Sequence, residues 1–207
     1  EGRVLRPDDE RLRCIWQSAA EFDLPVLFHI GDLCAFFEPA DEKNEYIDTF
    51  REHPEWLFAE DRYYRFAELM AMQENLLRQN PGTTFIIPHV GSFAENLAQV
   101  GEWLDRFPNL YVDIADRLHE LGRQPYTARA FFRRYADRIL FGTDLLPTDT
   151  ERYPIYWEFL ETFDEYFPYR TKNGVMLGDW NIYGIGLEDD VLEKIYFRNA
   201  QAVLKTD

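Results

Sequence analysis

Four short apolar runs, each with an ionisable side chain at its carboxyl end, constrain the fold of this 207-residue chain more than any other feature. The runs cover residues 26–30, 84–89, 110–113 and 139–144, and the four ionisable residues are His29, His89, Asp113 and Asp144. Continuous apolar runs of this length are typical of strands that are buried on both faces, as in parallel sheets.

Apolar residues at helical spacing separate these runs. The spacing predicts helices over residues 7–24, 63–79, 92–107, 126–136, 153–163 and 188–203. The third of these helices is expected to begin with a capping box formed by Ser92 and Glu95. Strands that alternate with helices are joined by right-handed crossovers and therefore run parallel. We expect an α/β fold in a single domain over residues 1–207.

Residues 33–61 form a connection that exceeds the usual loop length. This segment is rich in Glu, Asp and Phe, and its length indicates a functional insertion or lid. A looser stretch over residues 168–187 precedes the last predicted helix.

The composition restricts partners and compartment. Lys and Arg number 22 against 38 Asp and Glu, a net charge of −16 that repels phosphate backbones and anionic lipid headgroups. We expect neither nucleic acid nor a membrane as a partner. Cys14 and Cys34 have no metal-finger or redox-motif spacing, which favours free thiols in a reducing, cytoplasmic setting. No signal peptide and no apolar stretch long enough for a spanning helix is recognisable.

The carboxyl ends of parallel strands converge on the ligand crevice of α/β sheets and barrels. Two imidazoles and a carboxylate at such ends are the ingredients of a zinc, manganese or iron site. Each residue also has a structural interpretation. A single strand-end histidine is often a satisfied structural group, Asp144 can cap a turn, and Asp113 can accept local backbone hydrogen bonds.

Four further polar residues follow the predicted strands at a distance. Arg117 and Arg123 lie just beyond the third strand and could clamp a substrate carboxylate through bidentate hydrogen bonds, although surface ion pairs are the alternative. His53 and His119 stand in polar sequence contexts that favour solvated positions.

The chain resembles the amidohydrolase-related (amidohydrolase-2) family of the metal-dependent hydrolases. The motifs that carry the resemblance are Pro25-Val26-Leu27-Phe28-His29, Phe85-Ile86-Ile87-Pro88-His89, Ile139-Leu140-Phe141-Gly142-Thr143-Asp144 and the closing segment from Val191 to Ala200. The resemblance implies a TIM (β/α)8 barrel. It also implies that His29 is a metal ligand from the fifth strand and that His89 is an active-site histidine from the sixth. Asp144 would bind metal and transfer protons from the eighth.

One departure from the family pattern concerns the metal ligands. The first strand of the family carries a His-x-His pair, and no His-x-His occurs in this sequence. The visible strands correspond to the fifth through eighth, and a full barrel needs about 250 residues. We therefore expect the C-terminal half of a barrel, which is completed by sequence upstream of Glu1, completed by a second copy in a homo-oligomer, or folded as an open sheet with weakened metal affinity.

The resulting functional hypothesis is a metal-dependent hydrolase in which a metal-activated water attacks a C–O or C–N bond of a small polar substrate. Asp144 and His89 would be catalytic, His29 and Asp144 would bind zinc or manganese, and Arg117 and Arg123 would bind substrate. One alternative is a non-oxidative decarboxylase of a small aromatic or unsaturated acid. The other is a catalytically silent half-barrel with a binding or assembly role.

Overall fold

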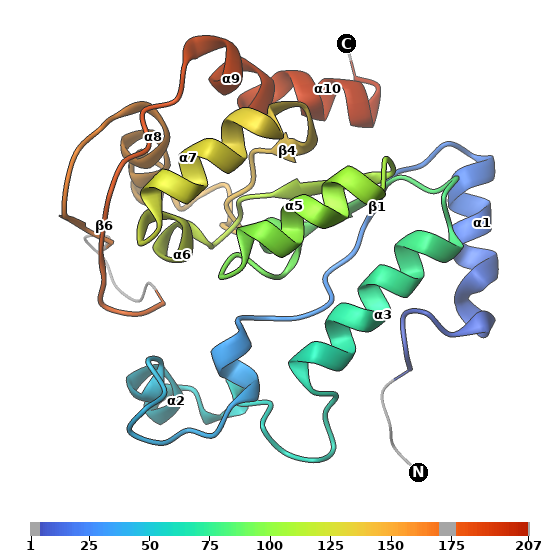
Figure 1. The fold of residues 1–207 in the computed structure, drawn as a ribbon, viewed down its shortest axis with the longest axis horizontal. Helices are drawn as coiled ribbons and strands as arrows, with labels where there is room; N and C mark the ends of the chain where they lie inside the picture. The colour runs from blue at the N-terminus through green and yellow to red at the C-terminus, as the bar shows by residue number, and fades with distance from the viewer. Residues whose placement is uncertain (1–4, 170–176, 207) are drawn as a thin grey trace.

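A four-stranded parallel sheet forms the centre of the chain in a computed structural model that describes residues 5–169 and 177–206 (Figure 1). Its strands are β1 (Val26–Leu27), β2 (Phe85–Ile87), β3 (Leu110–Asp113) and β4 (Ile139–Leu140), in that spatial order. Val26 pairs with Phe85, Phe85 with Leu110, and Val112 with Ile139. The parallel α/β arrangement expected from the sequence is confirmed.

Helices connect the strands, and the longer ones lie in the segments where the periodicity predicts them, whereas the short helices at residues 47–52, 88–91 and 118–122 were not predicted. Before β1 lie η1 (Glu10–Leu12) and α1 (Arg13–Glu21); β1 and β2 are joined by η2 (Cys34–Phe37), α2 (Ile47–Glu52), η3 (Pro54–Trp56) and α3 (Phe66–Gln79). Between β2 and β3 lie α4 (Pro88–Gly91) and α5 (Leu97–Arg106), and between β3 and β4 lie α6 (Leu118–Gly122), α7 (Pro125–Arg134) and η4 (Ala136–Arg138). After β4 come η5 (Thr150–Arg152), α8 (Pro154–Glu161), β5 (Phe167–Pro168), β6 (Asn181–Ile182), α9 (Asp189–Glu193), η6 (Lys194–Arg198) and α10 (Asn199–Leu204).

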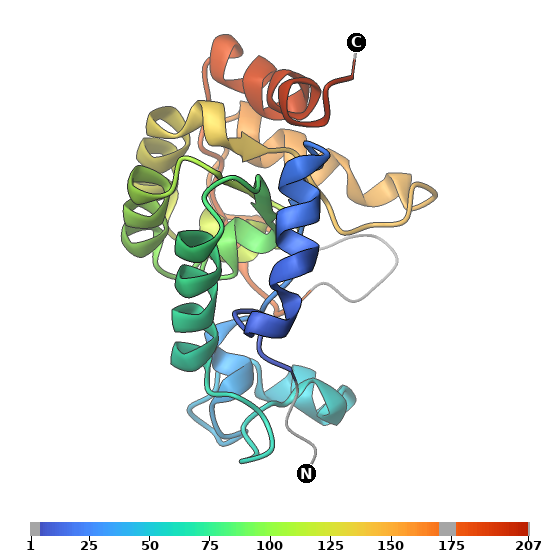
Figure 2. The same cartoon turned by 90° about the vertical axis from the view of Figure 1, so that its right-hand side faces the viewer.

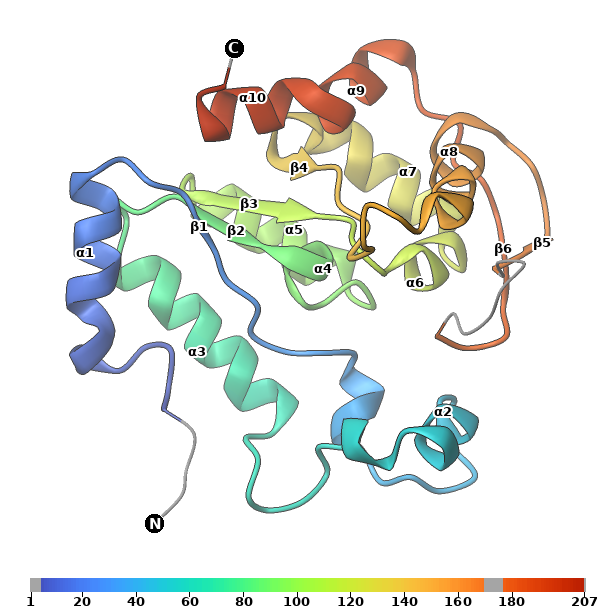
Figure 3. The same cartoon turned by 180° about the vertical axis from the view of Figure 1, so that it is seen from behind.

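The two faces of the sheet differ in how well they are covered. Side chains on one face, among them Phe85, Leu110 and Val112, are fully buried in the core shared with α3, α5 and α7. On the other face Ile86 and Leu140 pack against Val203 of α10, whereas Leu27 of β1 is 65% exposed. Seen from behind, β2 and β3 lie in front of α5 (Figure 3). In the described part of the chain the sheet is open and does not close into a barrel.

The predicted strands are longer than the observed ones, and backbone conformation explains the difference. His89 and Asp144 have φ values of 59° and 56°, which lie in the left-handed region and are incompatible with an extended strand. Both residues therefore follow their strands. The predicted capping box is also wrong. Ser92 has φ 58°, and the residue that caps α5 is Asn96, whose side chain accepts the Gln99 N–H.

The 33–61 insertion has a small core of its own. Leu33, Phe36, Tyr46 and Phe50 are buried against one another, and Figures 1 and 2 place α2 at the opposite end of the molecule from α9 and α10. Part of the looser 168–187 stretch falls outside the described residues. Among the residues described, no helix has the length and apolar character that crossing a bilayer requires, and both cysteines are free.

Candidate functional site

His29 and His89 come together beyond the carboxyl ends of neighbouring strands. His29 follows β1 and His89 follows β2, and their ring centroids lie 5.1 Å apart with the planes at 89°. His89 is 7% exposed, whereas the side chain of His29 is 46% exposed, with its Nε2 3.7 Å from Asp32 Oδ1. One imidazole of the pair is thus enclosed and the other open to a ligand.

His89 projects from a turn of left-handed backbone. His89, Val90, Gly91 and Ser92 have consecutive φ values of 59°, 57°, 69° and 58°. A β-branched residue such as Val90 is strained in this region by about 1–2 kcal/mol. Local hydrogen bonds offset the strain, because Ser92 N–H donates to the Pro88 carbonyl across 3.0 Å and Gln73 Nε2 donates to the Gly91 carbonyl across 3.0 Å.

The hydrogen bonds of His89 define its tautomer. Its Nδ1 lies 2.8 Å from the Ala115 carbonyl oxygen, which can only accept, so Nδ1 carries the proton. Burial, together with the charge of Arg117, lowers the pKa of His89 to about 4. At neutral pH the ring is therefore uncharged, and its Nε2 lone pair is available to a proton or a ligand.

Asp113 and Asp144 have different surroundings. Asp113 is 7% exposed, and its Oδ1 accepts the N–H groups of His89 at 2.9 Å and Ala115 at 3.0 Å. Burial raises the pKa of the Asp113 carboxyl despite these bonds, and the nearby charge of Asp144 raises it further. Asp144 itself is exposed.

The structure pairs His29 with His89 without completing a metal site. Within residues 5–169 and 177–206, no group of three or more His, Cys, Asp or Glu side chains is placed to hold a metal ion. His29 offers a nitrogen donor of the kind that a divalent cation accepts, but the described side chains do not complete a donor set of three around it. The metal-ligand roles of His29 and Asp144 stay predictions.

Arg117 lies buried beside the histidine pair. It is 3% exposed, its Nη1 donates to the Asp116 carbonyl across 2.6 Å, and its Nη2 is 3.8 Å from Asp32 Oδ1. Asp32 is thus close to both Arg117 and His29. The Arg117 guanidinium also lies 3.7 Å from Asp116 Oδ2, so both neighbouring carboxylates stand farther away than a hydrogen bond.

Arg123 is occupied by other partners. Its guanidinium donates to Glu45 Oε2 across 2.8 Å and to Glu120 Oε1 across 2.6 Å, and it lies 4.3 Å from the centroid of the Trp180 ring. Binding a substrate would require Arg123 to leave these contacts. The predicted substrate roles of Arg117 and Arg123 are both untested.

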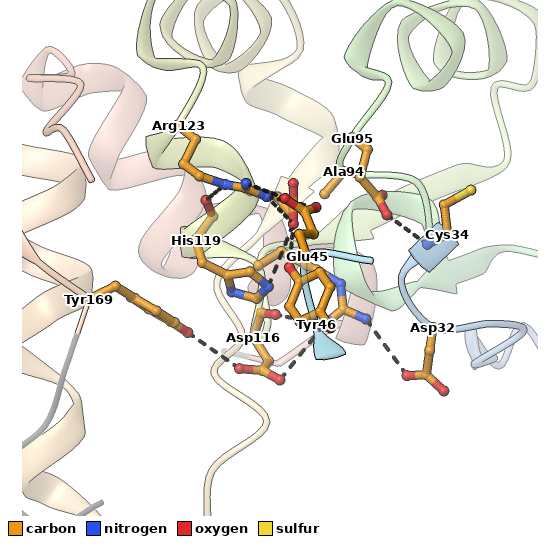
Figure 4. Close-up of polar contacts among 12 residues, drawn as sticks. Asp32, Cys34, Glu45, Tyr46, Ala94, Glu95, Asp116, His119, Arg123 and Tyr169 are labelled. Carbon is orange, nitrogen blue, oxygen red and sulfur yellow. Dashed lines mark hydrogen bonds and ion pairs between the residues drawn. The ribbon is translucent and has the colours of Figure 1, made fainter. Parts of the chain in front are cut away.

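His119 corrects one prediction from the sequence. Its sequence context predicts a solvated side chain, yet His119 is 0% exposed, because the rings of Tyr46 and Tyr169 cover it at centroid distances of 6.2 Å and 5.1 Å (Figure 4). Neither ring nitrogen has a hydrogen-bond partner, and burial holds the pKa of His119 well below its usual value. His53, by contrast, stacks on Trp56 with ring centroids 4.1 Å apart.

Sequence reasoning missed the polar residues that join the strand ends to one another. Asp116 N–H donates to Tyr156 Oη across 3.1 Å, Tyr156 Oη donates to the Thr143 carbonyl across 3.1 Å, and Tyr169 Oη donates to Asp116 Oδ1 across 3.4 Å. Figure 4 shows Asp116 facing Tyr169. No local pattern marks these residues, since their partners lie far away along the chain. Asp32 alone could have been found, because it stands three residues after His29.

The chain is similar to one protein family and to several solved structures. The amidohydrolase-2 family model, described as amidohydrolase, matches residues 1–206. No curated protein sequence matches the chain. Among solved structures, a TIM-barrel protein from Bordetella bronchiseptica is 19% identical, with a TM-score of 0.53, and the match covers 97% of this chain and 52% of that one.

Two decarboxylases are similar to the same extent. The 2,6-dihydroxybenzoate decarboxylase from Rhizobium is 18% identical with a TM-score of 0.51, and the match covers 97% of this chain and 57% of the decarboxylase. The dihydroxybenzoic acid decarboxylase from Polaromonas sp. JS666, solved with manganese and the inhibitor 2-nitroresorcinol, is 17% identical with a TM-score of 0.52 over 97% and 55% of the two chains. The chain thus spans a little over half the length of these structures. Sequence identities this low show a similar fold and no more.

Proposed function

Because the chain belongs to the amidohydrolase family, we propose that it supplies His29, His89 and Asp144 to the active site of a metal-dependent enzyme that acts on a small polar molecule. The resemblance found in the sequence is confirmed by the family match. The observation that carries the proposal is the contact between His29 and His89 at the carboxyl ends of adjacent parallel strands, which is where barrel enzymes place their active sites.

Each residue has a distinct part in this proposal. His29 and Asp144 would hold a divalent metal, zinc or manganese, and the manganese of the Polaromonas decarboxylase supports a cation of this class. Such a metal would supply a bound water of lowered pKa and would polarise the substrate. His89, uncharged at neutral pH, accepts a proton at Nε2, and Asp144 takes the proton of the attacking water.

Two reactions fit these groups. Hydrolysis of a C–O or C–N bond needs a group that takes a proton from water and returns it to the leaving group, which is the role given to Asp144, with His89 contacting the substrate or the water. Non-oxidative decarboxylation needs instead a cation that binds the substrate carboxylate and a group that gives a proton to the carbon from which carbon dioxide leaves, and buried Arg117 beside the histidine pair favours this second candidate. The structural likeness to two dihydroxybenzoate decarboxylases is compatible with it.

A catalytically silent protein with an assembly role is the remaining alternative. The open sheet and the 65% exposure of Leu27 support a face that another copy or further barrel strands would cover. In this alternative the histidine pair would bind no metal with useful affinity.

Metal titration separates the enzyme from the silent protein. We expect the purified chain to bind Zn²⁺ or Mn²⁺ in calorimetry, His29→Ala and Asp144→Ala each to weaken binding at least tenfold, and His53→Ala to bind as the wild type. His53 is the matched control because it stacks on Trp56 in the insertion. Wild-type affinity in both His29→Ala and Asp144→Ala would contradict the assignment.

Substrate screening separates the two reactions. Incubation with hydroxybenzoates and with small esters or amides should release either carbon dioxide or a carboxylic acid. If decarboxylation is the reaction, Arg117→Gln should raise KM strongly, whereas Arg123→Gln should change it far less. Equal effects of the two variants would contradict the specific role given to Arg117.

A further inference from the structure

We infer that Asp113 is a positioning residue that fixes both the backbone and the ring tautomer of His89. The inference deepens the proposed function, and it rests on that function only in giving His89 a catalytic role. It assigns a task to the fourth strand-end residue, the one that neither holds the metal nor contacts the substrate in the proposal above.

A single oxygen of Asp113 holds the backbone of His89. Asp113 Oδ1 accepts the N–H groups of His89 and Ala115, at 2.9 Å and 3.0 Å. His89 opens the run of four left-handed residues, so its N–H lies where the strand gives way to the strained turn. A buried carboxylate that accepts two backbone N–H groups is a strong, charge-assisted anchor for such a turn. It offsets the cost of the unusual conformation of Val90.

The tautomer part follows from the same contact. Ala115, whose N–H is bound by Asp113, presents its carbonyl to His89 Nδ1 at 2.8 Å. The carboxylate therefore fixes both ends of one arrangement: the backbone that carries the ring and the residue whose carbonyl selects the Nδ1–H tautomer. Only this tautomer leaves the Nε2 lone pair free.

The neighbouring strand leaves room for this carboxylate. A Cβ added at Gly142, which follows β4, would lie 3.1 Å from Asp113 Cγ and 3.2 Å from Oδ2. Such a contact is tighter than ordinary van der Waals packing, so the Asp113 side chain would have to shift by a few tenths of an ångström. Gly142→Ala is therefore a second way to disturb the anchor while the carboxylate is retained.

The test reads the ring of His89 directly in metal-free protein. The chain has four histidines, and a His89→Gln variant assigns the His89 signals in 15N-labelled protein near pH 8. We expect a single Nδ1–H tautomer in the wild type and in Asp113→Asn, because the asparagine oxygen can accept the same two N–H groups. Asp113→Ala should lose this signature and give shifts averaged over both tautomers, and Gly142→Ala should move partway toward them.

A matched control separates positioning from general loss of stability. Thr83 is 1% exposed and donates its hydroxyl to the Trp16 carbonyl across 2.8 Å, at the opposite end of β2 from His89. Thr83→Ala should lower the unfolding midpoint and leave the His89 tautomer unchanged. The inference is overturned if Asp113→Ala keeps the wild-type tautomer, if Asp113→Asn loses it, or if Thr83→Ala changes it. If Asp113→Ala does not fold, the other two variants test the inference: Asp113→Asn should keep the wild-type tautomer, and Gly142→Ala should move partway toward averaged shifts. None of these readings depends on which reaction the site performs.

Discussion

Tyr46 donates its hydroxyl proton to Glu120 Oε1 across 2.5 Å, and this bond joins the 33–61 insertion to α6. Both residues are buried, at 1% and 5% exposure. Arg123 donates to the same Glu120 oxygen and also to Glu45, the neighbour of Tyr46. The insertion is therefore held to the sheet side of the molecule by a polar contact placed next to buried His119.

Removal of the Tyr46 hydroxyl should loosen the insertion. Tyr46→Phe keeps the ring against His119 but leaves Glu120 with one partner fewer, at a cost of about 1–2 kcal/mol. We expect faster hydrogen exchange across residues 33–61 and little change in α5 and α7. Tyr126→Phe is the control, because Tyr126 is 91% exposed. Equal exchange in Tyr46→Phe and wild type would show that the insertion is held by its own core.

The pH dependence of stability should report the burial of His119. Burial lowers the pKa of His119 well below the usual value of 6.5, so as the pH falls below that value the unfolded chain takes up a proton that the folded chain refuses. Folding stability is therefore lost toward acid pH and is unaffected by this group above its unfolded pKa. Urea unfolding of wild type and His119→Phe between pH 8 and pH 5 measures the difference.

The variant has an expected sign at each end of this range. Phenylalanine removes two buried nitrogens that lack hydrogen-bond partners, one of which lies 4.0 Å from Glu120 Oε1, so near pH 8 His119→Phe should match or exceed wild-type stability by about 1 kcal/mol. Its advantage should grow as the pH is lowered. His89, with its pKa lowered to about 4, contributes a slope of the same sign to both proteins and cancels in the difference. A constant difference across the pH range would mean that His119 gains solvent or a partner.

The sequence predicts the sheet well because its signal is local. Apolar runs and helical spacing give four parallel strands in chain order, and the convergence of strand ends brings His29 to His89. The left-handed turn after β2 is not predictable in this way. It depends on Asp113, 24 residues after His89, and on Gln73, 18 residues before Gly91.

The burial of polar residues also depends on contacts that are distant along the chain. His119 stands among charged neighbours, a context that indicates solvent. Tyr46, from a segment more than 70 residues earlier, covers His119 and bonds to Glu120. Arg117 likewise lies 3.8 Å from Asp32, which belongs to the loop after β1. Such pairs arise from tertiary packing, and a single sequence carries no local pattern for them.

Exposed Leu27 should contribute to self-association. It lies on the sheet face that α10 covers only in part, and burial of an apolar side chain of this size contributes about 1.5–3 kcal/mol. If the expected homo-oligomer forms through this face, Leu27→Ser should weaken association in sedimentation velocity, while Leu146→Ser, at another site of 69% exposure, should not. Unchanged sedimentation of Leu27→Ser would move the interface elsewhere or remove it.

The contact between α6 and β6 should tolerate no added methyl group. A Cβ at Gly122 would lie 2.5 Å from Ile182 Cβ and 3.0 Å from its Cγ2, and Ile182 is fully buried. Gly122→Ala forces these elements apart, and overpacking of this kind costs about 1–3 kcal/mol. Because α6 lies between Arg117 and Arg123, the displacement should also disturb the Glu120 contacts.

Gly82→Ala is the matched control, since its nearest neighbour would be Ala20 Cβ at 3.7 Å, an ordinary contact. Thermal unfolding should show a lower midpoint for Gly122→Ala and an unchanged or slightly higher one for Gly82→Ala, and equal midpoints would show that β6 can shift without cost.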